Sequence, residues 1–71
     1  MLSKDERGKY PIGTVVRLKK TGEFAIITDK GFLMDRPDGF LNYYCKIEGR
    51  GDGNWALYDE DFELESLPPS D

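Results

Sequence analysis

The sequence predicts an all-β fold, a small barrel of five short strands with a single helical turn before the last strand. Apolar and polar residues alternate along several short segments, as is typical of half-buried strands. Glycine-rich turns separate these segments, and no stretch has the apolar spacing of a helix of ten or more residues. A 71-residue chain of this kind hides its strand edges most simply by curling its sheet into a barrel.

The first two strands are expected to form a hairpin from Thr14 to Asp29. In TVVRLKK, Val16 and Leu18 share one face, and Arg17 lies on the other. TGE then supplies a tight turn in which Gly22 can adopt positive φ, and the β-branched run FAIITD returns as the second strand.

The next two strands are expected to form a second hairpin, from Phe40 to Tyr58, after a loop at residues 35–39. The segment Phe32–Met34 is either a short strand or a piece tucked under the core. In FLNYYCKIE the alternation predicts an inner face and an outer face, and the glycines of GRGDGN predict the turn before WALY. The expected inner residues are Leu41, Tyr43, Cys45 and Ile47, and the expected outer residues are Phe40, Asn42, Tyr44 and Lys46.

The segment WALYDEDFELE closes the predicted fold with a strand, a turn at Asp59–Phe62 and a last strand in ELESL. Asp59 is expected to cap the turn, because its carboxylate can accept a backbone N–H. The apolar residues of the segment are assigned to its structural part, and the core is the expected place for the aromatic ones. The apolar residues are Trp55, Leu57, Phe62 and Leu64, of which Trp55 and Phe62 are the aromatic ones.

The order of these elements resembles the SH3-like small barrels of bacterial and phage proteins, with Tudor-like or KOW-like topology. The resemblance lies in PIGTVVRLKKTGEFAIITD, the aromatic strand YYCKI, the Trp strand, the turn DEDF and the closing ELESL. It implies a binding module that is seldom catalytic by itself. The expected domain is residues 10–67, preceded by a flexible charged arm at residues 1–9 and followed by a tail at residues 68–71.

The composition argues against several classes of site. The chain has no histidine and one cysteine, Cys45, so neither a disulfide within the chain nor a Cys/His zinc site can form. Cys45 is expected to be a small buried hydrophobe. The five carboxylates between Asp59 and Glu65 are read as a solvated negative face, and RGD at residues 50–52 as turn chemistry. We therefore expect no enzyme activity, no metal and no cofactor.

The composition also bears on location. A single thiol fits a reducing compartment. No apolar run approaches the roughly 18 residues needed to span a bilayer, and MLSKDERGKY lacks the apolar stretch of a signal peptide. A cytoplasmic protein without a membrane partner is expected.

The charge is distributed unevenly along the chain. Residues 1–20 hold six bases and two acids, a net +4, and residues 21–71 hold four bases and twelve acids, a net −8. If the first hairpin exposes its bases, a basic strip next to an exposed aromatic ring would suit single-stranded RNA or DNA. The residues of that strip are Arg17, Lys19, Lys20 and Lys30.

Three functions follow, in order of preference. The first is a small acidic protein-interaction module, of the kind found among bacterial or phage accessory factors, that docks on a partner through an aromatic patch. The second is nucleic-acid binding by the basic strip. The third is a nucleic-acid mimic or an inhibitor of a host protein. The aromatic residues expected to contact a partner are Tyr44, Tyr58 and Phe40.

Overall fold

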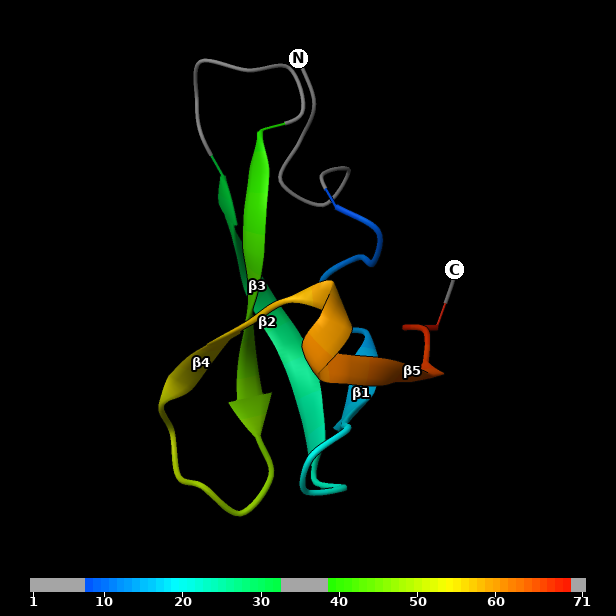
Figure 1. Ribbon diagram of the computed structural model, residues 1–71, viewed down its shortest axis with the longest axis vertical. Coiled ribbons are helices and arrows are strands. Elements are labelled where there is room, and N and C mark those ends of the chain that lie inside the picture. The colour runs from blue at the N-terminus through cyan, green and yellow to red at the C-terminus, as the bar shows by residue number, and fades with distance from the viewer. Residues whose placement is uncertain (1–7, 33–38, 70–71) are drawn as a thin grey trace.

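The computed structural model describes residues 8–32 and 39–69 and shows one antiparallel sheet of five strands (Figure 1). Several predicted segments lie wholly or partly outside the described residues: residues 1–7 of the predicted arm at 1–9, residues 35–38 of the predicted loop, Leu33 and Met34, and residues 70–71 of the predicted tail. The strands are β1 (Val15–Leu18), β2 (Phe24–Phe32), β3 (Phe40–Ile47), β4 (Asn54–Leu57) and β5 (Phe62–Ser66), and a 3-10 turn, η2 (Asp59–Asp61), precedes the last of them.

The strand order in the sheet is β4-β3-β2-β1-β5, so β4 and β5 are its two edges. All four neighbouring pairs are antiparallel. In Figure 1, β2 and β3 form a long hairpin, and β1 and β5 cross it at one side. The predicted all-β class, the five strands and the turn before the last strand are confirmed. Closure of the sheet into a barrel stays a prediction. No helix within the described parts of the chain is long and apolar enough to cross a bilayer.

Glycines shape both hairpin turns, as predicted. Gly22 has a φ of 77°, and its amide donates to the carbonyl of Leu18 over 2.8 Å. Gly49 and Gly51 have φ values of 87° and 78° in the turn between β3 and β4. An L-residue with a side chain is strained in this left-handed region, so glycine is what allows the chain to reverse in so few residues.

The core is the inner face of the sheet. Val16 and Leu18 of β1 are buried as predicted, and Tyr43 and Cys45 of β3 are fully buried. Four partly buried residues pack against this cluster, among them Tyr10 from the segment before β1. The buried cluster consists of Val16, Leu18, Ala25, Ile27, Tyr43, Cys45, Ile47 and Phe62.

An aromatic cluster closes one end of this core. The ring of Tyr43 lies 4.6 Å from Phe40, 5.6 Å from Phe62 and 6.0 Å from Tyr10, measured between ring centroids. The hydroxyl oxygen of Tyr43 accepts hydrogen bonds from the backbone amides of Lys9, at 2.7 Å, and Tyr10, at 3.0 Å. The contacts of the sheet domain therefore include Lys9, which belongs to the predicted arm.

The first half of β3 departs from the expected burial, although Asn42 and Tyr44 share a face as predicted. Leu41, expected inside, is 48% exposed, whereas Asn42, expected outside, is 8% exposed. The pairing between β2 and β3 shifts register between Gly31 and Phe32, so Leu41 is the extra residue of a bulge. Gly31 also makes room for Asn42, because a Cβ added to Gly31 would lie 2.6 Å from the Oδ1 of Asn42. The prediction for these two side chains was wrong for that reason.

One further assignment to the core, that of Trp55, was wrong, and Leu64, assigned to the structural part of its segment, is exposed as well. Trp55 is 44% exposed and Leu64 is 45% exposed. Both residues lie on edge strands, where a neighbouring strand shields them on one side alone. By contrast, Phe62 is buried and Leu57 packs against the core as predicted.

Arg50 joins the two hairpin turns. Its guanidinium donates two hydrogen bonds to the carboxylate of Glu23, at 2.7 and 3.0 Å, and lies 5.3 Å from the ring centroid of Trp55. The hydrogen bond from Arg50 holds the pKa of the Glu23 carboxyl below its usual value. The turn that contains the RGD tripeptide is thus attached to the turn that precedes β2.

Candidate functional site

The surface of the sheet that faces away from the core, here called the outer face, carries large apolar side chains. Val15 of β1 pairs with Ile26 of β2, and Ile26 pairs with Lys46 of β3, so these three share the outer face. Phe24 is 42% exposed, Ile26 is 41% exposed and Tyr44 is 36% exposed. A surface with this many neighbouring apolar side chains is typical of contact sites.

An open hollow of about 310 Å³ lies on the outer face and is lined mostly by apolar atoms. We call it the apolar hollow. It lies between the start of β2 and the end of β3, and the turn after β3 contributes two glycines. Its lining residues are Val15, Phe24, Ala25, Ile26, Lys46, Ile47, Glu48, Gly49 and Gly51.

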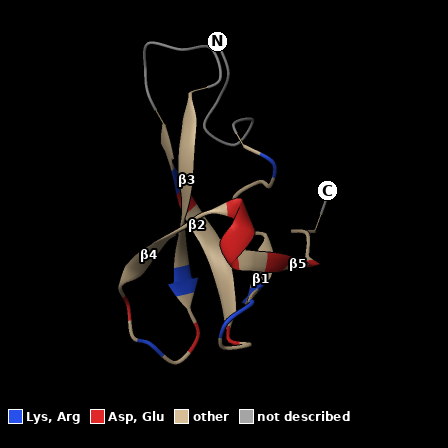
Figure 2. Cartoon of the chain, viewed as in Figure 1, with Lys and Arg blue, Asp and Glu red and all other residues tan. Residues whose placement is uncertain are grey.

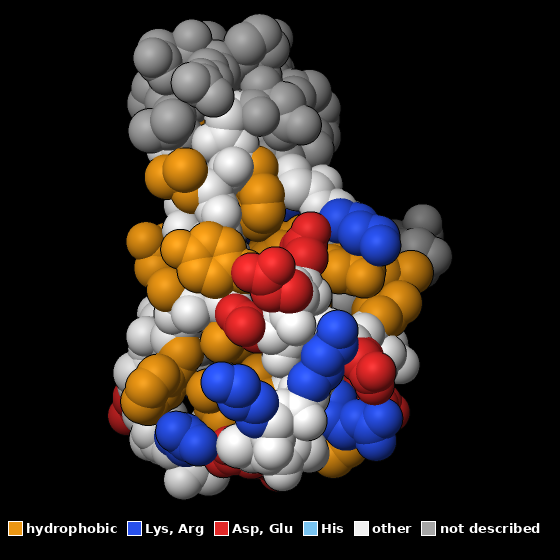
Figure 3. Space-filling view, in the orientation of Figure 1, with side chains coloured by type: hydrophobic (Ala, Val, Ile, Leu, Met, Phe, Trp, Pro, Cys, Tyr) orange, Lys and Arg blue, Asp and Glu red, His pale blue; other side chains and the backbone are white. Residues whose placement is uncertain are grey.

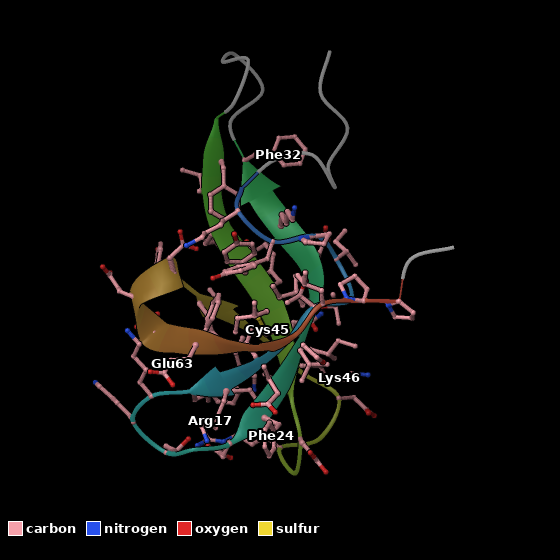
Figure 4. All side chains as sticks on the ribbon, turned by 90° about the vertical axis from the view of Figure 1, so that its right-hand side faces the viewer. Arg17, Phe24, Phe32, Cys45, Lys46 and Glu63 are labelled. Carbon is pink, nitrogen blue, oxygen red and sulfur yellow. The ribbon has the colours of Figure 1, made fainter. Side chains whose placement is uncertain are left out.

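A second, more polar hollow of about 440 Å³ adjoins the first at Phe24. Arg17 and Glu63 line it, and the Nη2 of Arg17 lies 3.3 Å from the Oε2 of Glu63. Figure 4 shows Phe24 near the lower end of the sheet, between Arg17 on one side and Lys46 on the other. Phe24 therefore separates an apolar hollow from a charged one.

The structure brings together part of the predicted basic strip. Arg17, Lys19 and Lys20 are exposed at the end of β1 and in the turn that follows, but Lys30 is 3% exposed and does not join them on the surface. Glu63 pairs with Arg17, and Figure 3 shows acidic and basic side chains next to each other on this side of the molecule. The positive charge available to a phosphate backbone is thus smaller than predicted. The nucleic-acid hypothesis stays a prediction.

The three aromatic residues predicted to contact a partner do not form one patch. Tyr44 lies on the outer face, paired with Ala56 of β4. Phe40 is half-buried, and its ring packs against Tyr43 in the core. Tyr58 is 52% exposed and lies between β4 and η2. Of the three, Tyr44 is the one that adjoins Ile26 and Lys46 through its position on β3.

The five acidic residues of WALYDEDFELE lie on η2 and β5 (Figure 2). Within η2 it is Asp61, and not Asp59 as predicted, whose carboxylate caps the turn: its Oδ2 accepts a hydrogen bond from the amide of Tyr58 at 2.9 Å. Among residues 8–32 and 39–69, no three His, Cys, Asp or Glu side chains are placed to hold a metal ion.

Sequence reasoning missed Phe24 and Ile26 as surface residues. The signal was present in FAIIT, where apolar residues occupy both faces of one strand: Phe24 and Ile26 on one, Ala25 and Ile27 on the other. An antiparallel sheet with one wet face normally places polar residues at alternate positions. Apolar residues on both faces of this strand therefore predict that some of them are exposed, as Phe24 and Ile26 are.

Cys45 is fully buried, as predicted, and the loss of hydration raises the pKa of its thiol from an ordinary 9.0 to about 12. Burial likewise raises the pKa of the Tyr43 hydroxyl, an effect that the hydrogen bonds from the Tyr10 and Lys9 amides oppose and the neighbouring Asp59 carboxylate adds to. Both groups lose their protons more readily in the unfolded chain. Their contribution to stability is therefore complete below the unfolded pKa values and is lost as the pH rises through the folded ones.

We accordingly expect the free energy of unfolding to fall as the pH rises above about 9, by at most ~1.4 kcal/mol per pH unit for each proton involved. Urea titrations between neutral pH and pH 11 measure this. In Cys45→Ala the decline is expected to start about one pH unit later, because Tyr43 alone then contributes, with an ordinary pKa of 10.0. A free energy of unfolding that stays constant between neutral pH and pH 11 would contradict the burial of Cys45 and Tyr43.

Comparison with protein-family models, with curated proteins and with solved structures gives no significant match to this chain.

Proposed function

We propose that this protein is a non-enzymatic interaction module with an SH3-like barrel fold, which docks on a protein partner through its outer face. The observation that carries the proposal is the apolar hollow, with Phe24 and Ile26 more than two-fifths exposed beside it. Keeping such side chains in water costs about 25 cal/mol for each Å² of apolar surface, and a partner that covers them recovers that energy.

The fold assignment is supported by the strand order β4-β3-β2-β1-β5 and by the position of η2 immediately before β5. This is the element order for which the sequence resembles SH3-like barrels. In such a barrel β4 and β5, the two edges of the described sheet, approach each other. A barrel of this size leaves little interior space, so its contact surface lies on its outside.

The chemistry of the outer face favours a protein as the ligand. Aromatic and aliphatic side chains at the centre of a surface with charges at its margin are typical of protein interfaces. Tyr44 extends the apolar surface along β3 away from the hollow. The charges at the margin include both signs, Lys46 and Glu48, whereas a phosphate-binding surface needs an excess of bases.

An affinity capture tests the proposal, with the full chain as bait in an extract of the cells that produce it. Ile26→Ser and Tyr44→Ala are expected to weaken capture of a specific partner by about tenfold or more, because buried aromatic and aliphatic residues dominate interface energies. Leu64→Ser is the matched control, since Leu64 is equally exposed but lies on β5. The three variants should keep their circular dichroism spectra.

Capture counts in favour of the proposal where Ile26→Ser and Tyr44→Ala lose a protein that the wild-type chain and Leu64→Ser retain. If all four chains retain the same proteins, the outer face is not the docking surface and the proposal is wrong.

A further inference from the structure

The margin of the apolar hollow carries one positive and one negative side chain on the same strand. Lys46 and Glu48 both line the hollow and are two positions apart on and just after β3, which places them about 7 Å apart along the strand. The Nζ of Lys46 is 4.0 Å from the Oδ1 of Asp52, and the two side chains are 48% and 104% exposed. Such an exposed pair is weak, so Lys46 can exchange its partner at little cost.

This charge pattern is self-complementary. In a symmetric dimer the same surface occurs on both copies, and residue i of one contacts residue j of the other while j contacts i. If two β3 strands cross antiparallel beside a twofold axis at Ile47, Lys46 of each copy faces Glu48 of the other. The apolar side chains of the two hollows, Phe24 and Ile26, then cover one another between these pairs.

The overall charge of the chain also favours this face. Two copies that each carry a net charge of −4 repel, and five of the fourteen acids of each copy lie together on η2 and β5 (Figure 2). At the apolar hollow the lining charges, Lys46 and Glu48, cancel. Two copies therefore meet there at a lower electrostatic cost than at the acidic elements.

Resting on the proposed function, we propose that the partner seated on the outer face is a second copy of this chain, related by a twofold axis beside residue 47. A partner of strongly acidic or strongly basic character would leave one of the two lining charges facing a like charge. A second copy pairs both.

The association state in solution tests the inference. Sedimentation equilibrium over a range of concentrations is expected to show a reversible dimer. Ile26→Asp is expected to yield a monomer, because the dimer would bury an unpaired carboxylate. Leu64→Asp introduces the same carboxylate on β5 and is expected to leave the dimer intact.

Charge reversal supplies a readout that a merely apolar contact would not give. Lys46→Glu places Glu opposite Glu48, and Glu48→Lys places Lys opposite Lys46, so each single reversal is expected to raise the dimer dissociation constant about tenfold or more. The double variant Lys46→Glu/Glu48→Lys restores both pairs and is expected to return to within a few-fold of the wild-type constant. All three variants alter surface side chains, so the unfolding midpoint measured at concentrations at which the chain is monomeric should be nearly unchanged.

Two outcomes overturn the inference: a chain that is monomeric at every concentration, or a double variant that is at least as weak as the singles. The proposed function is judged separately. If the chain is monomeric and Ile26→Asp loses the captured partner, the outer face is the docking surface, but its occupant is not a second copy. If the chain is monomeric and Ile26→Asp does not affect capture, both the proposed docking surface and the proposed second copy are wrong.

Discussion

Replacing Phe62 with alanine is expected to lower the free energy of unfolding by about 3 to 5 kcal/mol, the usual cost of removing a buried phenylalanine. Phe62 is 3% exposed, and its ring centroid lies 5.6 Å from that of Tyr43 and 5.9 Å from that of Tyr10. Domains of this size are stable by roughly 0.05 to 0.15 kcal/mol per residue, or about 4 to 11 kcal/mol here. The substitution thus removes a large share of the total.

Urea unfolding followed by circular dichroism measures this loss. Leu64→Ala is the matched control, because Leu64 lies two positions along the same strand but is 45% exposed, and it is expected to cost less than about 1 kcal/mol. Equal losses in the two variants would mean that Phe62 does not occupy the core.

Replacing Tyr43 with phenylalanine is expected to cost about 2 kcal/mol although it removes a single oxygen atom. That oxygen accepts hydrogen bonds from the amides of Lys9 and Tyr10 and is also hydrogen-bonded to the carboxylate of Asp59. A buried amide that loses its partner forfeits about 1 to 3 kcal/mol of solvation. The expected loss is at the lower end of what two amides could forfeit, because they are only partly buried.

The local signature of this change is hydrogen exchange. In Tyr43→Phe the amides of Lys9 and Tyr10 are expected to exchange faster than the loss of global stability explains. Amides in the centre of β3 are expected to exchange faster only by the amount that the global stability falls. Tyr44→Phe, one residue away and on the outer face, is the control and should leave both the stability and the two amides unchanged. Unaltered exchange at Lys9 and Tyr10 in Tyr43→Phe would contradict the described contact.

The parts of the fold that the sequence predicts correctly are those in which a local pattern decides the structure. Alternation places Val16 and Leu18 on the inner face of β1, and both are buried. Glycine at positions 22, 49 and 51 permits the positive φ that the turns require. Neither inference needs knowledge of which strand lies next to which.

The parts that the sequence predicts incorrectly depend on neighbours. Trp55 has the residue type of a core anchor, but its strand is an edge, and only the sheet order reveals this. Asn42 is buried because Gly31 on the adjacent strand has no side chain. A pattern read along one strand does not contain the register of the next one.

The same reasoning applies to the candidate site. Tyr44 was found from the alternation of β3, and Arg17 from that of β1. The apolar hollow could not be found in this way, because it forms where β2 and the turn after β3 meet. Lys30 was expected beside the other bases because it follows them on the next strand, but it is buried, after the register shift between Ile27 and Asp29.

The attachment of Arg50 to Glu23 and Trp55 has a practical consequence for anyone who modifies this chain. The segment GRGDGN is glycine-rich and exposed, which makes it an obvious place to insert a tag or a fluorophore. An insertion beside Arg50 would release both turns at once and disturb the border of the apolar hollow, to which Gly49 and Gly51 belong. Labels are better fused after residue 69, beyond the last strand.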